Sequence, residues 1–204
     1  PFPAKNRLLL MGRDVSTRYT MRGADMYERI AQYIVTAAEG RKGNYMAFFP
    51  SYKVMEEVYG YFLSFAGKID SVIQSQSMRE AEREAFLKMF EEDRENSLVG
   101  FCVMGGIFSE GIDLTEERLI GTWIVGTGLP QVCLERELLK QFFDEKGMNG
   151  FDYAYLYPGM NKVLQAAGRV IRTDTDRGMI YLLDDRFCQN HYRSVFPREW
   201  RYVT

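Results

Sequence analysis

The stretch Tyr45-Met46-Ala47-Phe48-Phe49-Pro50-Ser51 decides the fold class of this 204-residue chain. Five consecutive apolar residues are followed by Pro50 and Ser51, which favour the end of a strand and the start of a helix. A strand without polar alternation is typical of a parallel sheet that is covered on both faces. We therefore expect a buried parallel strand here, followed by a helix over about 53–65.

The same alternation of strand and helix patterns continues in both directions along the chain. Short connections between alternating elements favour an α/β fold, with a mostly parallel central sheet flanked by helices and functional groups at the carboxyl ends of the strands. The expected strands cover 7–11, 45–49, 69–73, 97–103, 119–125 and 178–183. The expected helices cover 25–39, 53–65, 78–91, 134–143 and 160–172, and a helical tail is expected over 184–192. The ordered body is expected to end near Phe196-Pro197.

Composition is ordinary for a globular protein, with 46% hydrophobic and 26% charged residues. The length fits one domain over 1–204, and the opening Pro1-Phe2-Pro3 indicates a segment of a larger protein. With no long apolar run and no leader pattern, a cytoplasmic location is expected. The net charge of −2 argues against strong autonomous nucleic-acid binding, but it is compatible with a share in a composite groove.

Cysteine and histidine positions show no pattern of a disulfide framework or a metal site. Cys102, Cys133 and Cys188 are odd in number and widely spaced, which favours reduced, buried thiols. His191 is the only histidine, and no cysteine stands beside it in the sequence. We therefore expect no metal ligand in this chain.

A loop from Gly105 to Asp113 directly follows the expected strand over 97–103. Its glycines permit tight turns and leave backbone amides for an anionic or ribose group, and Asp113 is suited to accept a hydrogen bond from a ribose hydroxyl. The alternative is a plain strand-to-helix connection with a surface acid. The spacing matches neither a Walker A loop nor a dinucleotide-binding fingerprint.

The stretch Gln165-Ala166-Ala167-Gly168-Arg169-Val170-Ile171-Arg172 places an amide and two guanidinium groups at positions i, i+4 and i+7 of the last long expected helix. On an α-helix these three side chains share one face. Two permanent cations beside an amide suit a polyanion such as a nucleoside triphosphate. The alternative is a solvated helix whose arginines pair with acidic neighbours.

Taken in order, three stretches resemble motifs IV, V and VI of the second RecA-like motor domain of superfamily 2 helicases, of the XPD/DinG branch. They are 48–52, 106–113 and 165–172, and the likeness extends through 125–130 and 177–187. The resemblance thus covers nearly the whole chain. It implies a RecA-like three-layer domain that lacks a Walker A motif of its own.

For the nucleotide, the resemblance implies that Arg169 and Arg172 reach a triphosphate held by a first motor domain, with Arg172 as the arginine finger. Gln165 would position the γ-phosphate or the attacking water. ATP and Mg²⁺ would be held mainly by that first domain, and an iron–sulfur cluster, where the parent protein has one, would lie elsewhere. The other residues implied at the nucleotide are Glu110, Gly111 and Asp113.

For single-stranded DNA, the resemblance implies contacts from the loops that follow three strands. Ser51 is equally suited to contact a phosphate or to cap a helix, and Gln76 either faces DNA or lies on the surface. The segment 16–22 mixes cations with Tyr19 and is either part of the strand channel or an exposed loop. The implied nucleic-acid-binding residues are Ser51, Gln76, Gly105, Gly106 and Ser109.

We therefore expect the C-terminal motor domain of an ATP-dependent, 5′-to-3′ DNA helicase. Its partners would be the first RecA-like domain of the same polypeptide and single-stranded DNA, with no membrane. The chain alone is expected to be inactive, because it supplies an arginine finger without a phosphate-binding loop. Two alternatives stay open: a docking module that does not hydrolyse ATP, and the motor part of a helicase–nuclease fusion.

Overall fold

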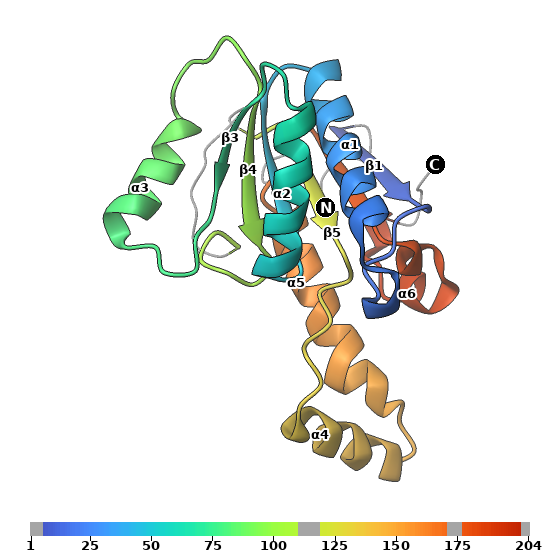
Figure 1. Ribbon diagram of the computed structural model, residues 1–204. Helices are drawn as coiled ribbons and strands as arrows, with labels where there is room; N and C mark the ends of the chain where they lie inside the picture. The colour runs from blue at the N-terminus through green and yellow to red at the C-terminus, as the bar shows by residue number, and fades with distance from the viewer. Residues whose placement is uncertain (1–5, 110–118, 171–176, 201–204) are drawn as a thin grey trace.

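A computed structural model describes residues 6–109, 119–170 and 177–200 of the chain. Its centre is a six-stranded parallel sheet with the strand order β1-β6-β5-β2-β4-β3. Helices cover both faces of this sheet, which confirms the three-layer α/β architecture (Figure 1). The strands are β1 (Arg7–Gly12), β2 (Asn44–Phe49), β3 (Asp70–Ile73), β4 (Leu98–Val103), β5 (Gly121–Val125) and β6 (Gly178–Leu183).

Side chains of the central strand β2 alternate between two separate cores. Tyr45, Ala47 and Phe49 belong to the core under α1 (Ala24–Gly40) and α2 (Tyr52–Phe65). Met46 and Phe48 point the other way and join the opposite core. All five side chains are fully buried, as the uninterrupted apolar run predicts.

The opposite core is closed by α3 (Glu80–Met89), α5 (Tyr157–Ala167) and the C-terminal segment. That segment forms the short helices η4 (Asp185–Cys188), α6 (Asn190–Ser194) and η5 (Arg198–Trp200). Trp200 is buried and packs edge-on against Phe196, with 5.4 Å between the ring centroids. The expectation that the ordered body ends near Phe196-Pro197 is therefore wrong, because Trp200 completes this core.

Between β5 and α5 the chain forms a hairpin that projects beyond the carboxyl edge of the sheet (Figure 1). It consists of α4 (Leu134–Glu145) and the π-helical turn η3 (Asp152–Leu156), which continues directly into α5. Pro158 explains the π turn, since it has no N–H to donate to the carbonyl of Ala154 four residues earlier. Arg136 donates to that carbonyl instead, at 3.1 Å.

The helix that carries the glutamine and arginine stretch is displaced from its expected range of 160–172. It begins at Tyr157 and ends at Ala167, and Arg169 then donates its N–H to Ala166 in a tighter turn, at 3.3 Å. Arg172 lies outside the described residues. The expectation that Gln165 and Arg169 share one continuous helical face is therefore wrong, because the α-helix stops before Gly168.

The cysteines differ in their surroundings. Cys102 is fully buried, and this burial raises the pKa of its thiol. Cys188 is partly buried and Cys133 is exposed. The expectation of three buried thiols is therefore wrong for Cys133, which precedes the projecting hairpin rather than a core element.

Candidate functional site

The loops that carry the expected functional residues meet at the carboxyl edge of the sheet. This edge is formed by the ends of six parallel strands, so the segments after β2, β4, β5, β6 and β1 lie side by side there. Ser51 follows β2, whereas Gly105, Gly106 and Ser109 follow β4. Among the described residues, these four therefore lie at the carboxyl edge, as the α/β pattern predicts.

Ser51 caps helix α2. Its backbone is extended, and its side-chain oxygen accepts a hydrogen bond from the N–H of Val54 at 3.3 Å. The hydroxyl hydrogen remains available to donate to another group, because the cap uses only the oxygen as acceptor. The capping role is therefore present, and it is compatible with a contact to a bound anion.

The loop after β4 holds its own shape through Ser109. The hydroxyl of Ser109 accepts from the N–H of Gly105 at 2.9 Å and donates to the carbonyl of Val103 at 3.2 Å. The N–H of Gly106 donates to the same carbonyl at 3.1 Å. Ser109 is fully buried. The expectation of free amides at Gly105 and Gly106 is therefore wrong, and the Ser109 hydroxyl is directed into the loop.

A buried glutamine that sequence reasoning missed ties this loop to its neighbours. Gln74 is 3% exposed, donates to the hydroxyl of Tyr52 at 2.9 Å and accepts from the N–H of Val103 at 3.0 Å. Gln76, the residue expected at this position, is exposed in the following turn. Strand alternation does not separate the two glutamines, because residues 74 and 76 would point to the same face of a strand. The signal that favours Gln74 is that it directly follows β3, which ends at Ile73, whereas Gln76 lies in the turn beyond.

The turn after α5 meets the loop after β4 directly. The guanidinium of Arg169 donates to the backbone carbonyl of Ser109. Arg169 is half-buried by this contact, whereas Gln165, on the last turn of α5, is exposed. Two stretches separated by about 60 residues in the sequence are thus joined at one point. Glu110, Gly111, Asp113 and Arg172 lie outside the described residues.

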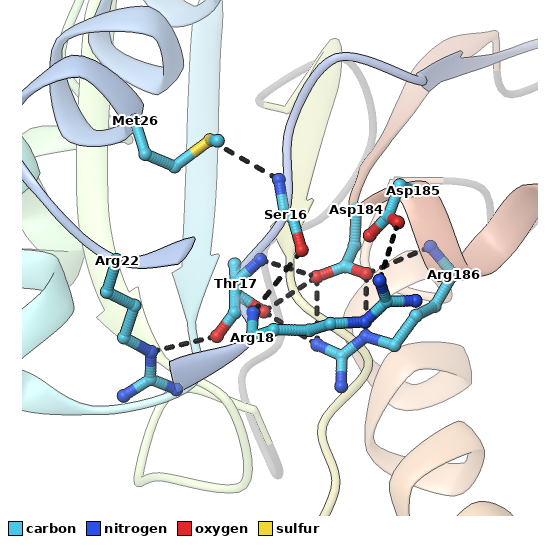
Figure 2. Close-up of polar contacts among 8 residues, drawn as sticks. All are labelled: Ser16, Thr17, Arg18, Arg22, Met26, Asp184, Asp185 and Arg186. Carbon is cyan, nitrogen blue, oxygen red and sulfur yellow. Dashed lines mark hydrogen bonds and ion pairs between the residues drawn. The ribbon is translucent and has the colours of Figure 1, made fainter. Parts of the chain in front are cut away.

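Asp184, at the end of β6, is the centre of a buried polar network (Figure 2). Its carboxylate accepts from the N–H and the hydroxyl of Thr17 at 2.9 and 2.7 Å. It also accepts from Nε and Nη2 of Arg186 at 2.7 and 2.9 Å. Asp184 has no exposed surface. The network therefore fastens the segment after β1 to the segment after β6.

The protonation state of this network follows from its contacts. Burial alone would raise the pKa of Asp184, but hydrogen bonds and charge from Arg186, together with hydrogen bonds from Thr17, bring it below its ordinary value of 3.8. Burial likewise opposes the charge of Arg186, and Asp184 more than compensates, so that the pKa of Arg186 is raised. Both groups stay ionised over the physiological range.

The segment held by Asp184 presents cations and an aromatic ring to solvent. It includes the short helix η2 (Tyr19–Met21), in which the Tyr19 side chain is 87% exposed. Arg18 forms an ion pair with Asp185 at 3.2 Å, and Nε of Arg22 donates to the carbonyl of Thr17 at 2.8 Å (Figure 2). The segment 16–22 is expected to be either part of the strand channel or an exposed loop. Ser16 and Thr17 are buried, and the residues from Arg18 onward are exposed.

Within the described ranges, no group of three or more histidine, cysteine or acidic side chains is placed to hold a metal ion. His191 contacts Asp152 at 2.6 Å, which joins α6 to the hairpin. No helix in the described part of the chain is long and apolar enough to cross a membrane.

Comparisons with known proteins agree with this arrangement. A family model described as the helicase C-terminal domain matches residues 34–203. The ATP-dependent DNA helicase XPD of Sulfolobus acidocaldarius is 27% identical over 187 residues, which are 87% of this chain and 31% of that protein. Regulator of telomere elongation helicase 1 of Bos taurus is 29% identical over 170 residues, 74% of this chain and 14% of that protein. The chain thus spans less than a third of these relatives.

Solved structures show the same fold. An XPD helicase superposes with a TM-score of 0.76 at 24% identity, over 92% of this chain and 33% of that one. Domain 2 of the DEAD-box helicase Mss116p, solved with an RNA duplex, superposes with a TM-score of 0.50 at 13% identity, over 87% of this chain and 54% of that one. Both are RecA-like domains.

Proposed function

Because the chain belongs to the helicase C-terminal domain family, we propose that it is the second motor domain of an ATP-dependent DNA helicase. The observation that carries this proposal is the contact between Arg169 and the carbonyl of Ser109. It brings the stretch that resembles motif VI against the stretch that resembles motif V. These are the two stretches that the resemblance assigns to one nucleotide.

On the nucleotide side, we assign the arginine finger to Arg172, with Arg169 and Gln165 beside it. Gln165 and Gly168 are exposed, so a second domain can reach the end of α5 at these residues. Arginine stabilises the charge that develops on a transferred phosphoryl group. A first motor domain of the same polypeptide would hold ATP and Mg²⁺. Glu110, Gly111 and Asp113 would border the nucleotide from the loop that Arg169 contacts.

On the DNA side, the carboxyl edge would hold one section of a single strand. We assign the contacts to phosphates or sugars to Ser51, Gln76 and the loop that contains Gly105 and Gly106. Ser109 supports this edge from inside, because its hydroxyl fixes the loop. The exposed ring of Tyr19 with its neighbouring arginines suits a base and its phosphates.

The expected cycle follows from the division of the ATP site between two domains. ATP would draw the domains together, and hydrolysis would release them, so that the pair advances along the strand. A 5′-to-3′ direction follows from the XPD/DinG resemblance alone. The isolated chain would bind DNA weakly and hydrolyse no ATP, and any iron–sulfur cluster would belong to another part of the protein.

A second candidate function is supported by the projecting hairpin. Leu134, Leu138 and Phe142 recur at four-residue steps along α4 and are all more than half exposed. An exposed apolar stripe of this kind is typical of a protein-binding surface. The chain would then act as a docking module that does not hydrolyse ATP.

The test that separates these functions is ATP hydrolysis by the full-length protein, measured with and without a single-stranded oligonucleotide. The motor proposal predicts turnover that rises when DNA is added. Absence of turnover, or a turnover rate that does not change when DNA is added, contradicts the motor proposal and favours the docking function. A matched control is the Leu138→Ala variant, because a change on the α4 stripe should leave DNA-stimulated turnover unaltered.

A further inference from the structure

Lys162, on helix α5, lies across two loops at the carboxyl edge of the sheet. A Cβ atom added at Gly105 would lie 3.3 Å from Cε of Lys162, and one added at Gly128 would lie 3.4 Å from its Cβ. The lysine stem therefore runs from the loop after β5 to the loop after β4. Sequence reasoning gave Lys162 no role, because a lysine in an amphipathic helix carries no distinguishing signal.

The two glycines leave room for this side chain. Gly105 and Gly128 have φ angles of +70° and +67°, which residues with a Cβ rarely adopt. Neither position therefore places a side chain between the lysine stem and the loop backbone. The stem is held by packing, so its direction toward Gly105 is fixed by the fold rather than by a charged partner.

The ammonium group lacks a counter-charge in the described part of the chain. Lys162 is partly buried, yet no hydrogen bond or ion pair joins its Nζ to any described residue. Charged groups that lose part of their hydration are usually paired. A partly buried cation that has no counter-charge among the described residues, and whose stem is held at this edge, indicates a binding position for an anion.

We propose that Lys162 binds a phosphate of the nucleic-acid strand that passes over the loop at Gly105 and Gly106. This inference rests on the proposed function and adds a residue to its DNA side. A lysine is suited to this contact, because its ammonium acts as a point charge and needs no fixed geometry. The contact is to the backbone, so it is independent of base sequence.

The position of Lys162 favours the strand over the triphosphate. Arg169, which marks the nucleotide side, follows seven residues later, a rise of roughly 10 Å along a helix axis. Lys162 is the central residue of α5 and lies beside the loop at Gly128, whereas Arg169 lies beyond the end of that helix and contacts Ser109. The two cations thus contact different residues of the loop after β4, Lys162 at Gly105 and Arg169 at Ser109.

The test compares Lys162→Met with Lys162→Arg in the full-length protein. Methionine keeps the apolar stem that packs on the glycines and removes only the charge, so the fold is preserved. Lys42→Met is the matched control, since Lys42 is exposed and lies at the opposite, amino edge of the sheet. Binding of a labelled oligo-dT strand is measured over a range of salt concentrations, and ATP turnover is measured with saturating DNA.

Lys162→Met should weaken strand binding roughly fivefold, and the slope of log affinity against log salt should become shallower by about 0.7, the value for one phosphate contact. Lys162→Arg and Lys42→Met should keep the wild-type slope, and the KM for ATP should stay unchanged. An unaltered slope in Lys162→Met, or a raised KM for ATP instead, overturns the inference while the motor function stands. Failure of the wild-type protein to bind the strand overturns both the role of Lys162 and the proposed motor function.

Discussion

Replacing Arg172 with alanine should lower kcat for DNA-stimulated ATP hydrolysis by about 10³- to 10⁵-fold in the full-length protein. This factor is the usual worth of an arginine finger, equivalent to roughly 4–7 kcal/mol of transition-state stabilisation. The nucleotide should still bind, because the first motor domain would hold most of its phosphate contacts. Steady-state turnover and binding of a fluorescent ATP analogue would measure the two effects separately.

Arg177→Ala provides the control for this experiment. Arg177 is an exposed arginine five positions further along the chain, before β6. Its loss should leave kcat within about twofold, as is usual for surface substitutions. Equal losses in the two variants would indicate a general effect of charge or stability, and full activity in Arg172→Ala would remove the finger assignment.

Replacing Asp184 with alanine should produce the largest loss of stability among the polar residues described. Removing one partner of a buried ion pair leaves the other charge uncompensated and costs about 3–5 kcal/mol. For a domain of this size, that loss corresponds to a fall in Tm of roughly 6–20 °C. Thermal unfolding followed by circular dichroism would measure it.

The neighbouring Asp185 is the matched control for the ion-pair prediction. Its pair with Arg18 is partly exposed, with 42% of the Arg18 side chain accessible, so Asp185→Ala should cost less than about 1 kcal/mol. A double variant, Asp184→Ala with Arg186→Leu, should be less damaging than the sum of the single changes. Additive losses, or equal losses at 184 and 185, would contradict the network described here.

The same network predicts a pH dependence. The folded pKa of Asp184 is depressed, so its contribution to the free energy of unfolding is complete above the ordinary value of 3.8 and is lost as the pH falls through the folded pKa. The wild type should therefore lose stability in acid, below about that value. Asp184→Asn removes the titrating group, and its stability should depend less on pH over the same range.

The sequence predicts the sheet because its signal is local. The apolar run that ends at Pro50-Ser51 specifies a strand buried on both faces, and Ser51 indeed starts α2. Pro158 is a local signal that the expected helix range of 160–172 left unused, since a proline inside a helical pattern favours a disturbed helix, here the π turn. Each of these features depends only on residues within a few positions of one another.

The end of α5 and the role of Asp184 were beyond the reach of such reasoning. Gly168 is compatible with a helix interior as well as a helix end, and the structure shows that α5 ends just before it, at Ala167. Asp184 is paired with Thr17, which lies 167 positions away. In the sequence alone, a buried aspartate of this kind cannot be distinguished from an aspartate on the surface. Polar partners that are far apart in the sequence can be assigned only once the topology of the fold is known.

The most direct test of the motor assignment is the rate of DNA-stimulated ATP hydrolysis by the full-length protein that carries Arg169→Ala. Because Arg169 is the described residue at which the two nucleotide stretches meet, its loss should reduce turnover at least about a hundredfold. DNA binding by the same variant should stay near the wild-type level. Turnover equal to that of the wild type would contradict the assignment of this chain as the second half of a shared ATP site.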